Sequence, residues 1–161
     1  MAVPRVVFDS MLFLQAAVSP AGAAFACLHL AENGTVKLLL SPETLAEVTE
    51  LLSRPLVRRR FKTLTDEVVR RFLSRVESFA ETLPAPPKAF TLPRDPKDEI
   101  FTDLAVAGDA DYLVSWNERH LNYLMKQDTP EGKDFCVRYP ALKILTPVEF
   151  LRELVSQEQR H

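Results

Sequence analysis

Three acidic residues that are far apart in the sequence are candidates for one chemical site: Asp9, Glu47 and Asp98. Each follows a segment that we expect to be a strand, either directly or within the helix after it. Asn117 stands in the same kind of position later in the chain. In an open parallel sheet, ligands bind beyond the carboxyl ends of the strands. We therefore expect these four side chains to meet at one edge of a sheet.

The chemistry of such a group is that of a divalent metal. Carboxylates gathered in one place raise each other's pKa unless a cation neutralises them. Mg²⁺ or Mn²⁺ suits oxygen ligands, takes only one or two carboxylates directly and leaves room for a phosphate. The ion polarises a phosphoryl oxygen and lowers the pKa of a bound water, which can then attack in line. No serine, cysteine or histidine nucleophile is needed.

Structural roles are open for the first two acids. An acid at a strand end is often the N-cap of the next helix, and Asp9 could have that role alone. Glu47 has two rivals in the same helix, Glu43 and Glu50, and a solvated helix face would explain all three.

The third acid is ambiguous in another way. Asp95 and Asp98 both stand at the start of a helix, and Asp95 precedes a proline. We favour Asp98 as the ligand and Asp95 as a helix cap or near neighbour. Asp103 and Asp111 are expected to be structural or to face solvent.

Strand-like and helix-like segments alternate along the chain. We expect strands at residues 5–8, 35–40, 89–92, 112–115 and 143–145. We expect helices at residues 21–32, 41–53, 98–107 and 118–126, one after Asp9, one from Thr65 and a last one from Thr146. Capping signals begin three of these helices, at Ser41-Pro42, Thr65-Asp66 and Thr146-Pro147. Residues 83–87 form a proline-rich connector, and residues 127–140 are expected to be irregular.

This alternation predicts the α/β class. Right-handed crossovers between consecutive strands give a parallel sheet with helices on both faces. We expect a three-layer α/β/α sandwich with a central, mainly parallel sheet of four to five strands. A length of 161 residues suits one domain over residues 1–161.

Composition excludes several classes. The net charge of −2 argues against a surface that is basic all round, so any polyanion must meet a local patch. The four glycines are isolated and form no phosphate-binding loop. Cys27 and Cys136 are far apart, and we expect both to be buried thiols in a reducing compartment. We find no signal peptide pattern or membrane-spanning run and expect a cytoplasmic protein.

Four stretches resemble the PIN domain family, and together they cover nearly the whole chain. They read VVFDSMLFLQA, LSPETLAEVTELLSRP, RDPKDEIFTDLAVAGDADYLVS and LKILTPVEFLREL. The similarity is to the bacterial group of toxin components of toxin–antitoxin systems that is related to VapC. It implies a metal-dependent endoribonuclease, with RNA as substrate and an antitoxin protein as partner. The resemblance places Asp9, Glu47 and Asp98 at the family's Mg²⁺ or Mn²⁺ ligands.

The sequence departs from the family after the fourth strand. Many relatives have a further aspartate there, whereas this chain has Ser115, Trp116 and Asn117. Asn117 offers a carbonyl oxygen without a charge, so the site should hold one metal adequately and a second one poorly. Met11 also removes a polar group that is common after the first aspartate. These departures leave open a PIN module that binds RNA or a protein without cutting.

Other residues are candidates for supporting roles, each with a plainer reading. By its place in the family pattern, Ser115 is a candidate to hydrogen-bond a metal-bound water. His120 could shuttle a proton or contact phosphate, or be an ordinary surface histidine. Trp116 could stack on a base or fill a gap. A basic cluster could clamp phosphates or simply be solvated, and it consists of Arg58, Arg59, Arg60 and Lys62.

The early helices carry apolar side chains that could belong to the core or to an interface. Phe13, Phe25 and Leu28 are the residues in question. They leave open a homodimer or contact with an antitoxin.

Overall fold

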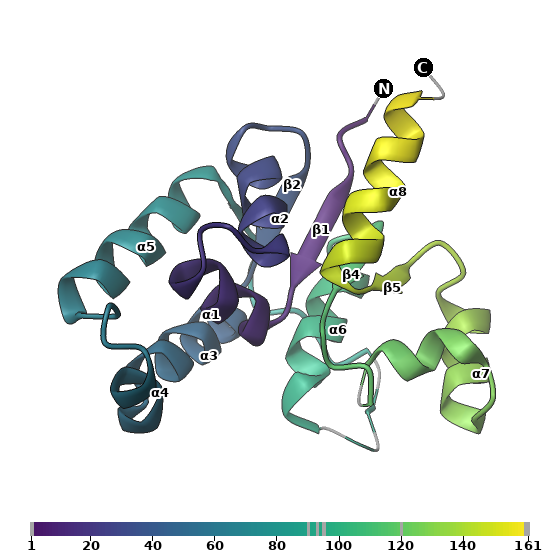
Figure 1. The fold of residues 1–161 in the computed structure, drawn as a ribbon. Coiled ribbons are helices and arrows are strands. Elements are labelled where there is room, and N and C mark those ends of the chain that lie inside the picture. The colour runs from purple at the N-terminus through teal and green to yellow at the C-terminus, as the bar shows by residue number, and fades with distance from the viewer. Residues whose placement is uncertain (1, 90, 93, 95, 120, 160–161) are drawn as a thin grey trace.

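The computed structural model describes residues 2–89, 91–92, 94, 96–119 and 121–159, and it contains one five-stranded parallel sheet (Figure 1). The strands lie in the order β3-β2-β1-β4-β5. Their bounds are β1 Arg5–Phe8, β2 Lys37–Leu40, β3 Glu81–Thr82, β4 Tyr112–Val114 and β5 Lys143–Leu145. All pairings are parallel, which confirms the predicted fold class.

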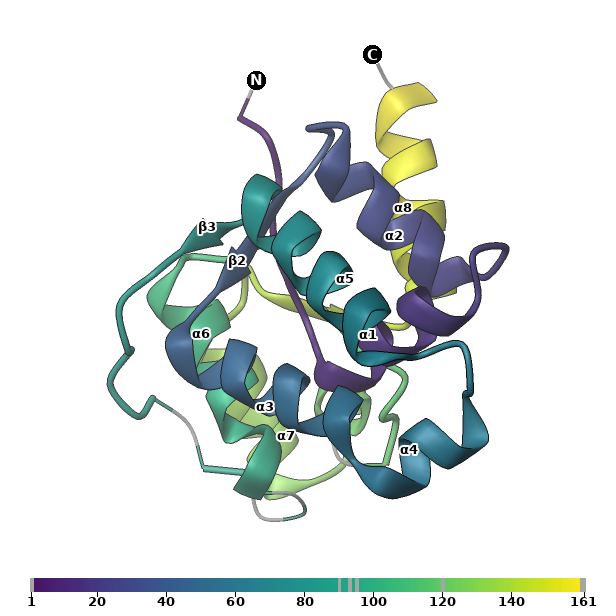
Figure 2. The same cartoon turned by 90° about the vertical axis from the view of Figure 1, so that its left-hand side faces the viewer.

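Helices cover both faces of this sheet. They are α1 Ser10–Val18, α2 Ala23–Glu32, α3 Pro42–Ser53, α4 Pro55–Arg60, α5 Asp66–Phe79, α6 Glu99–Ala107, α7 Pro130–Arg138 and α8 Pro147–Gln159. Two 3-10 helices, η1 Pro96–Asp98 and η2 Asn122–Lys126, lie between them. Figure 2, turned by 90°, shows β3 beside β2 at one edge of the sheet.

The alternation of side chains along β1 divides the core in two. Val6 and Phe8 point to the face covered by α1, α2, α3, α5 and α8. Val7 points to the opposite face, where it packs with residues of α6, η2 and α7. Since successive strand residues face opposite sides, a strand buried on both faces must be apolar at every position. This is why the strands read as short continuous apolar runs.

The capping signals begin helices where the sequence predicted. Ser41 and Thr44 exchange hydrogen bonds at the start of α3. Thr146 and Glu149 do the same before α8, each backbone N–H donating to the other's side chain. Each such box satisfies N–H groups that a helix start leaves without partners.

The predicted strand at residues 89–92 is wrong. The third strand is instead Glu81–Thr82, which pairs with β2 directly after α5. Leu83 still donates to Leu40 O at 2.8 Å, but Pro84 comes next and lacks the N–H that a longer pairing needs. Two backbone N–H groups of residues 89–92 donate to side chains of α6 instead of to a strand. Ala89 donates to Asp103 at 2.8 Å, and Leu92 donates to Glu99 at 3.0 Å. Phe90 lies outside the described residues. Asp103 is accordingly structural and buried.

The later helices also differ from the prediction. In place of a helix at residues 118–126 there is a turn followed by η2, because Leu121, Tyr123 and Leu124 donate to carbonyls four, five and three residues back. The region 127–140 is not irregular. It contains α7, which Thr129 caps by accepting from the N–H of Gly132 at 3.1 Å. The Thr-Pro pair that begins α7 is the same signal that correctly predicted α8.

Burial separates the side chains that the sequence left open. Phe13 and Leu28 belong to the core, whereas Phe25 is half-buried. Cys27 is buried, and burial raises the pKa of its thiol to about 12. Cys136 is only half-buried, so the expectation of burial was wrong for it, and both cysteines are free thiols.

None of the described helices is by itself long and apolar enough to cross a membrane. The pair α1 and α2 passes a test of length and composition only when taken together, across a bend of 98°.

Gly108, which ends α6, provides a test of how tightly this helix packs on β2. A Cβ at this position would lie 2.5 Å from Leu39 Cδ1 and 2.9 Å from Leu83 Cδ1. We predict that Gly108→Ala lowers the free energy of unfolding by about 1 to 3 kcal/mol, because overpacking forces neighbours apart. Urea unfolding measures this change.

Gly22→Ala is the matched control. Its new Cβ would meet only Ser19, with Oγ at 3.2 Å as the nearest atom. Its unfolding free energy should stay within about 0.5 kcal/mol of the original. Equal stability of the two variants would mean that Leu39 and Leu83 can move aside, contrary to the prediction.

Candidate metal centre

The candidate site lies at the point where the strand order reverses. From β1 the chain continues to β2 and β3 on one side, and β4 and β5 add on the other side. Asp9 directly follows β1, and its N–H donates to Val114 O of β4 at 3.2 Å. Residues 115–117 follow β4 on the same edge. Ligands bind in open α/β sheets at such a point, so the position agrees with the sequence prediction.

Asp9 is almost fully enclosed by the fold. Its side chain is 3% exposed. One carboxylate oxygen accepts from the N–H of Leu12 at 3.0 Å and so caps α1, while the other accepts from the Ser115 hydroxyl. Burial raises the pKa of Asp9 to about 6, and the hydrogen bonds from Ser115 and Leu12 oppose that rise. Asp9 therefore caps α1, and its carboxyl group is an ionisable group that is shielded from solvent.

A chain of hydrogen bonds links Asp9 to Asp98. Besides donating to Asp9, the buried Ser115 hydroxyl accepts from the backbone N–H of Asn117 at 2.9 Å. The Asn117 side-chain amide then donates to Asp98 Oδ2 at 3.0 Å. Asp98 itself is half-buried at the junction of η1 and α6. The segment after β4 thus bridges the two acids.

Glu47 reaches the same pocket from α3. It is half-buried, and Arg54 approaches Glu47 Oε1 to 3.5 Å from one end of that helix. Glu50 holds the same guanidinium more closely, at 2.7 Å. Of the three glutamates that competed in the sequence, Glu43, Glu47 and Glu50, only Glu47 lines the pocket.

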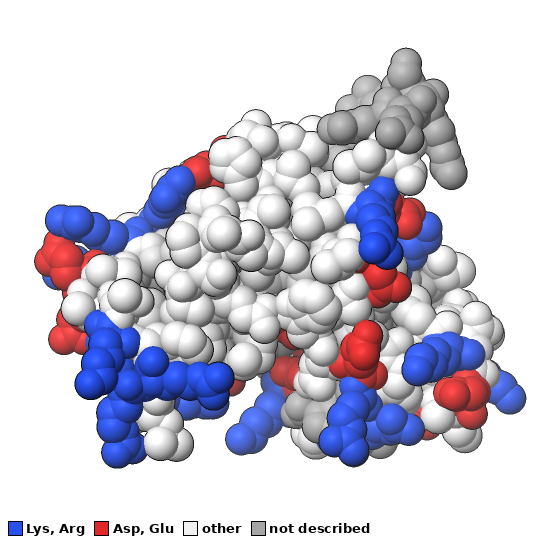
Figure 3. All heavy atoms as spheres, viewed as in Figure 1, with Lys and Arg blue, Asp and Glu red and all other residues white. Residues whose placement is uncertain are grey.

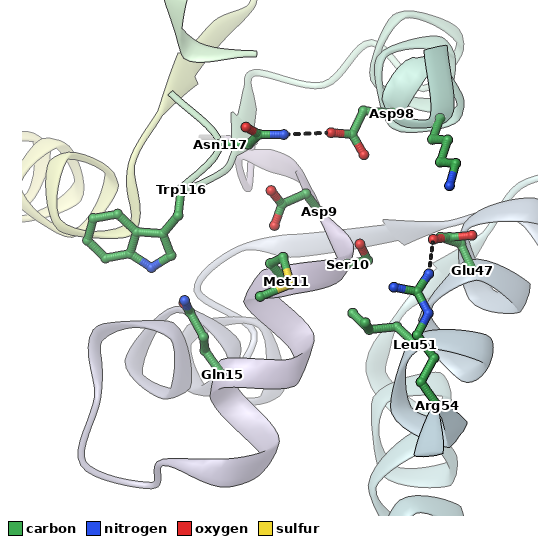
Figure 4. Close-up of a pocket in the computed structure, with 11 residues that line it drawn as sticks. Asp9, Ser10, Met11, Gln15, Glu47, Leu51, Arg54, Asp98, Trp116 and Asn117 are labelled. Atoms are coloured by element: carbon green, nitrogen blue, oxygen red, sulfur yellow. Dashed lines mark hydrogen bonds and ion pairs between the residues drawn. The ribbon is translucent and has the colours of Figure 1, made fainter. Parts of the chain in front are cut away.

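These residues surround one open pocket with a volume of about 500 Å³ (Figure 4). Its lining comes from α1, α3, η1 and the segment after β4. The lining residues are Asp9, Ser10, Met11, Gln15, Glu47, Leu51, Arg54, Lys97, Asp98, Trp116 and Asn117. In Figure 4, Glu47 and Arg54 lie on one side of Asp9 and Trp116 on the other. All three predicted acids therefore face one cavity.

The oxygen ligands of this pocket fit a hard divalent cation, although the three acids are not yet close enough to share one ion. Among the described residues, no three His, Cys, Asp or Glu side chains are already spaced to hold one metal ion. The pocket does offer carboxylate oxygens from three elements and an amide from Asn117, which are ligands that Mg²⁺ accepts. The buried carboxyl of Asp9 also gains most from a cation, because burial disfavours its charge.

Two predicted site residues, Asp95 and His120, lie outside the described residues. The basic cluster is described and lies on α4 and just after it. Arg58 is engaged within the fold, since it donates to Leu52 O at 2.6 Å and to Asp66 Oδ1 at 2.8 Å. Arg59, Arg60 and Lys62 are exposed. Basic side chains gather over α4 in Figure 3.

Sequence reasoning missed Arg54 and Gln15, which both line the pocket. Arg54 stands four residues after Glu50 and seven after Glu47, which places all three on one helix face and could have shown the contact. Nothing comparable in the sequence points to Gln15. Met11, which the sequence identified as an apolar substitute for a polar residue, lies in the pocket and is 44% exposed.

Comparisons with known proteins agree with this architecture. A crystal structure of VapBC2 from Rickettsia felis, bound to a DNA fragment from their promoter, is similar with a TM-score of 0.53. The similarity covers 88% of this chain and 98% of that chain at 16% sequence identity, and at this identity it shows a shared fold. No match was found among curated proteins.

A family model adds the sequence evidence. The model of the PIN domain matches residues 5–119, a range that contains Asp9, Glu47, Asp98 and Asn117. It extends over more than half of the chain and includes β1, β2, β3 and β4. The chain therefore belongs to the PIN domain family.

Proposed function

We propose that the protein is a metal-dependent endoribonuclease that hydrolyses RNA phosphodiester bonds. The observation that carries this proposal is the meeting of Asp9, Glu47 and Asp98 around one pocket at the reversal of strand order. PIN domains are typically nucleases, and the resemblance of the sequence to the family assigns these three acids to its metal ligands.

Asp9, Glu47 and Asp98 would hold Mg²⁺ or Mn²⁺, and Asn117 would complete the shell. When bound, the ion would activate a water for attack and offset charge on the phosphate. It would also compensate the carboxylates for their mutual repulsion.

The chain's own residues set the orientation of these acids. The Leu12 N–H and the Ser115 hydroxyl each hold one oxygen of Asp9, so its carboxylate cannot rotate freely. Asn117 fixes Asp98 in the same way through its amide. Preorganised ligands lose less entropy when a cation or a phosphate binds. The segment from Ser115 to Asn117 is therefore a positioning element of the proposed site.

Arg54 has a second possible use in this pocket. It lines the cavity and contacts Glu47 only at 3.5 Å. When Glu47 turns to a metal, the guanidinium can turn to a phosphate, whose geometry it matches with two donors. Exposed Arg59, Arg60 and Lys62 would extend this positive surface along the RNA backbone.

The biological role we propose is that of the toxin of a toxin–antitoxin pair in the cytoplasm. The structural similarity to the VapBC2 complex supports an antitoxin protein as partner. Such a partner could block the pocket by inserting a basic side chain among the acids. A homodimer is a further possibility that agrees with the half-buried Phe25 on α2.

One alternative rests on a specific observation. The Asn117 amide donates to Asp98, Arg54 lies near Glu47 and Ser115 donates to Asp9, so all three acids already have partners within the chain. A PIN module with such a site could bind RNA or a protein without cutting. The experiment below separates the two functions.

We predict that the purified protein cuts labelled RNA in the presence of Mn²⁺ and that EDTA stops the reaction. Asp9→Asn, Glu47→Gln and Asp98→Asn should each lower the cleavage rate at least about 100-fold, because each removes a charged ligand. Gel analysis of the products measures the rate.

Glu43→Gln is the matched control, since it makes the same change on α3 outside the pocket. It should cut RNA at the original rate. Equal faint cleavage by the original protein and Asp9→Asn would indicate a contaminating nuclease and would favour the module that does not cut.

Asp9 should also destabilise the metal-free fold at neutral pH. Its pKa is raised from 3.8 to about 6, so the folded state keeps the proton more tightly than the unfolded chain. Stability therefore falls as the pH rises from about 4 to about 6, by up to about 3 kcal/mol. Asp9→Asn removes the charge and keeps an acceptor for Leu12. In EDTA, this variant should gain stability over the original protein across that pH range.

Urea unfolding at pH 4, 6 and 8 measures the difference. Added Mn²⁺ should stabilise the original protein and leave Asp9→Asn unchanged, since binding to the folded state alone stabilises it. A variant that is less stable than the original in EDTA at pH 8 would show that the charge of Asp9 is not costly.

Asn117→Asp should strengthen metal binding. It replaces the amide donor next to Asp98 by a second carboxylate, whose repulsion only a cation relieves. We expect a roughly tenfold lower Kd for Mn²⁺ by calorimetric titration, given the size of charge interactions near a protein surface. Asn33→Asp adds the same charge at an exposed turn that does not line the pocket, so it should leave the Kd for Mn²⁺ unchanged. Weaker binding by Asn117→Asp would contradict the proposed shell.

A further inference from the structure

A second hollow lies beside the acidic pocket, and Trp116 separates the two. It is lined by Gln15, Ser19, Gly22, Ala23, Ala24 and Trp116, with a volume of about 260 Å³. Gln15 and Trp116 also line the acidic pocket. The two cavities are therefore neighbours that share one wall, and a bound chain molecule could occupy both.

Trp116 is far more exposed than the aromatic side chains of the core. It is 39% exposed. Phe8, Phe13 and Phe150 contact one another in edge-to-face pairs within the core. In the part of the chain that the structure describes, no ring–ring or cation–ring contact involves Trp116. The indole is thus available to an outside ring.

The backbone holds Trp116 in place on both sides. Ser115 before it is fully buried and donates to Asp9, while Asn117 after it donates to Asp98. The Trp116 carbonyl also accepts from the N–H of Glu118 at 2.8 Å. Because these bonds fix the backbone at Trp116, no backbone ordering is needed when a ligand stacks on its exposed indole.

The hollow has the chemistry of a site for a flat, neutral ring. Its lining includes the small residues Gly22, Ala23 and Ala24, and none of the described residues that line it is charged. Gln15 and Ser19 add an amide and a hydroxyl that can donate to or accept from a base edge. Over α1 and α2, the surface in Figure 3 is mostly uncharged.

We propose that this hollow binds an unpaired base of the RNA, stacked on Trp116, while the neighbouring phosphate enters the acidic pocket. This inference rests on the proposed function and narrows its substrate to single-stranded RNA. A paired base inside a duplex already has both faces covered, so only an unpaired one can stack on the indole. Gln15 and Ser19 contact the edge of that base.

Trp116 is the only tryptophan in the chain, so its fluorescence reports on this site alone. The experiment uses Asp9→Asn in EDTA, which makes base binding independent of metal and cleavage. A short unstructured oligoribonucleotide should quench the fluorescence saturably. The same oligonucleotide with abasic residues, or annealed to its complement, should not. A single-stranded DNA arm tests whether the site also accepts deoxyribose.

Binding of a labelled oligonucleotide to variants of Trp116 measures the stacking. Trp116→Ala should weaken binding roughly 5- to 100-fold, in the range found for single base–aromatic stacks. Trp116→Phe should restore most of it, because it keeps a ring. Neither variant should alter binding of the abasic oligonucleotide. Val137→Ala removes an exposed apolar side chain from α7 and should change nothing.

The two proposals can fail separately. If RNA is cut but neither quenching nor the loss in Trp116→Ala is seen, the base site is overturned and the nuclease stands. If bases quench Trp116 but Mn²⁺ produces no cleavage, the base site stands and the nuclease is overturned. Quenching by a protein partner alone would also overturn the base site, since Trp116 would then belong to a protein interface.

Discussion

The candidate site is arranged around one buried carboxylate. Asp9 is 3% exposed at the end of the central strand, and its charge is disfavoured there. Three elements are arranged around it: the start of α1 through Leu12, the segment after β4 through Ser115, and the pocket that α3 and η1 complete. A group that is costly to keep and is held in one orientation is typical of a functional site. Glu47 and Asp98 line the same pocket, and hydrogen bonds through Ser115 and Asn117 link Asp98 to Asp9.

Much of this arrangement could be predicted from the sequence because the signals were local or followed from topology. Apolar runs gave β1, β2, β4 and β5, and Ser-Pro or Thr-Pro pairs gave the starts of α3 and α8. The rule for strand ends placed Asp9 and Glu47, which follow β1 and β2, at one edge of the sheet. Asp98 lines the same pocket, although the strand expected before it at residues 89–92 is wrong. Glu47 emerged correctly as the pocket residue among three glutamates, because its place in the family pattern distinguishes it.

The remaining features depended on tertiary contacts. A strand of two residues, Glu81–Thr82, pairs only because β2 is present as a neighbour, and no periodicity marks it. The backbone of residues 89 and 92 bonds to Asp103 and Glu99, which a linear pattern cannot show. The ion pair of Glu47 with Arg54 means that this carboxylate already has a partner in the pocket. Two sequence signals were overlooked: the Thr129-Pro130 pair that begins α7, and the spacing of Arg54 from Glu47 and Glu50.

The bond between Ser115 and Asp9 joins residues 106 positions apart. During synthesis on a ribosome, the first acid is therefore made long before the hydroxyl that orients it. Ser115 reaches Asp9 because β4 pairs beside β1, so this bond requires a contact between distant parts of the chain. A nascent or truncated chain lacking β4 would hold Asp9 without its partner. The orientation of the first acid is thus coupled to the pairing of β4 with β1.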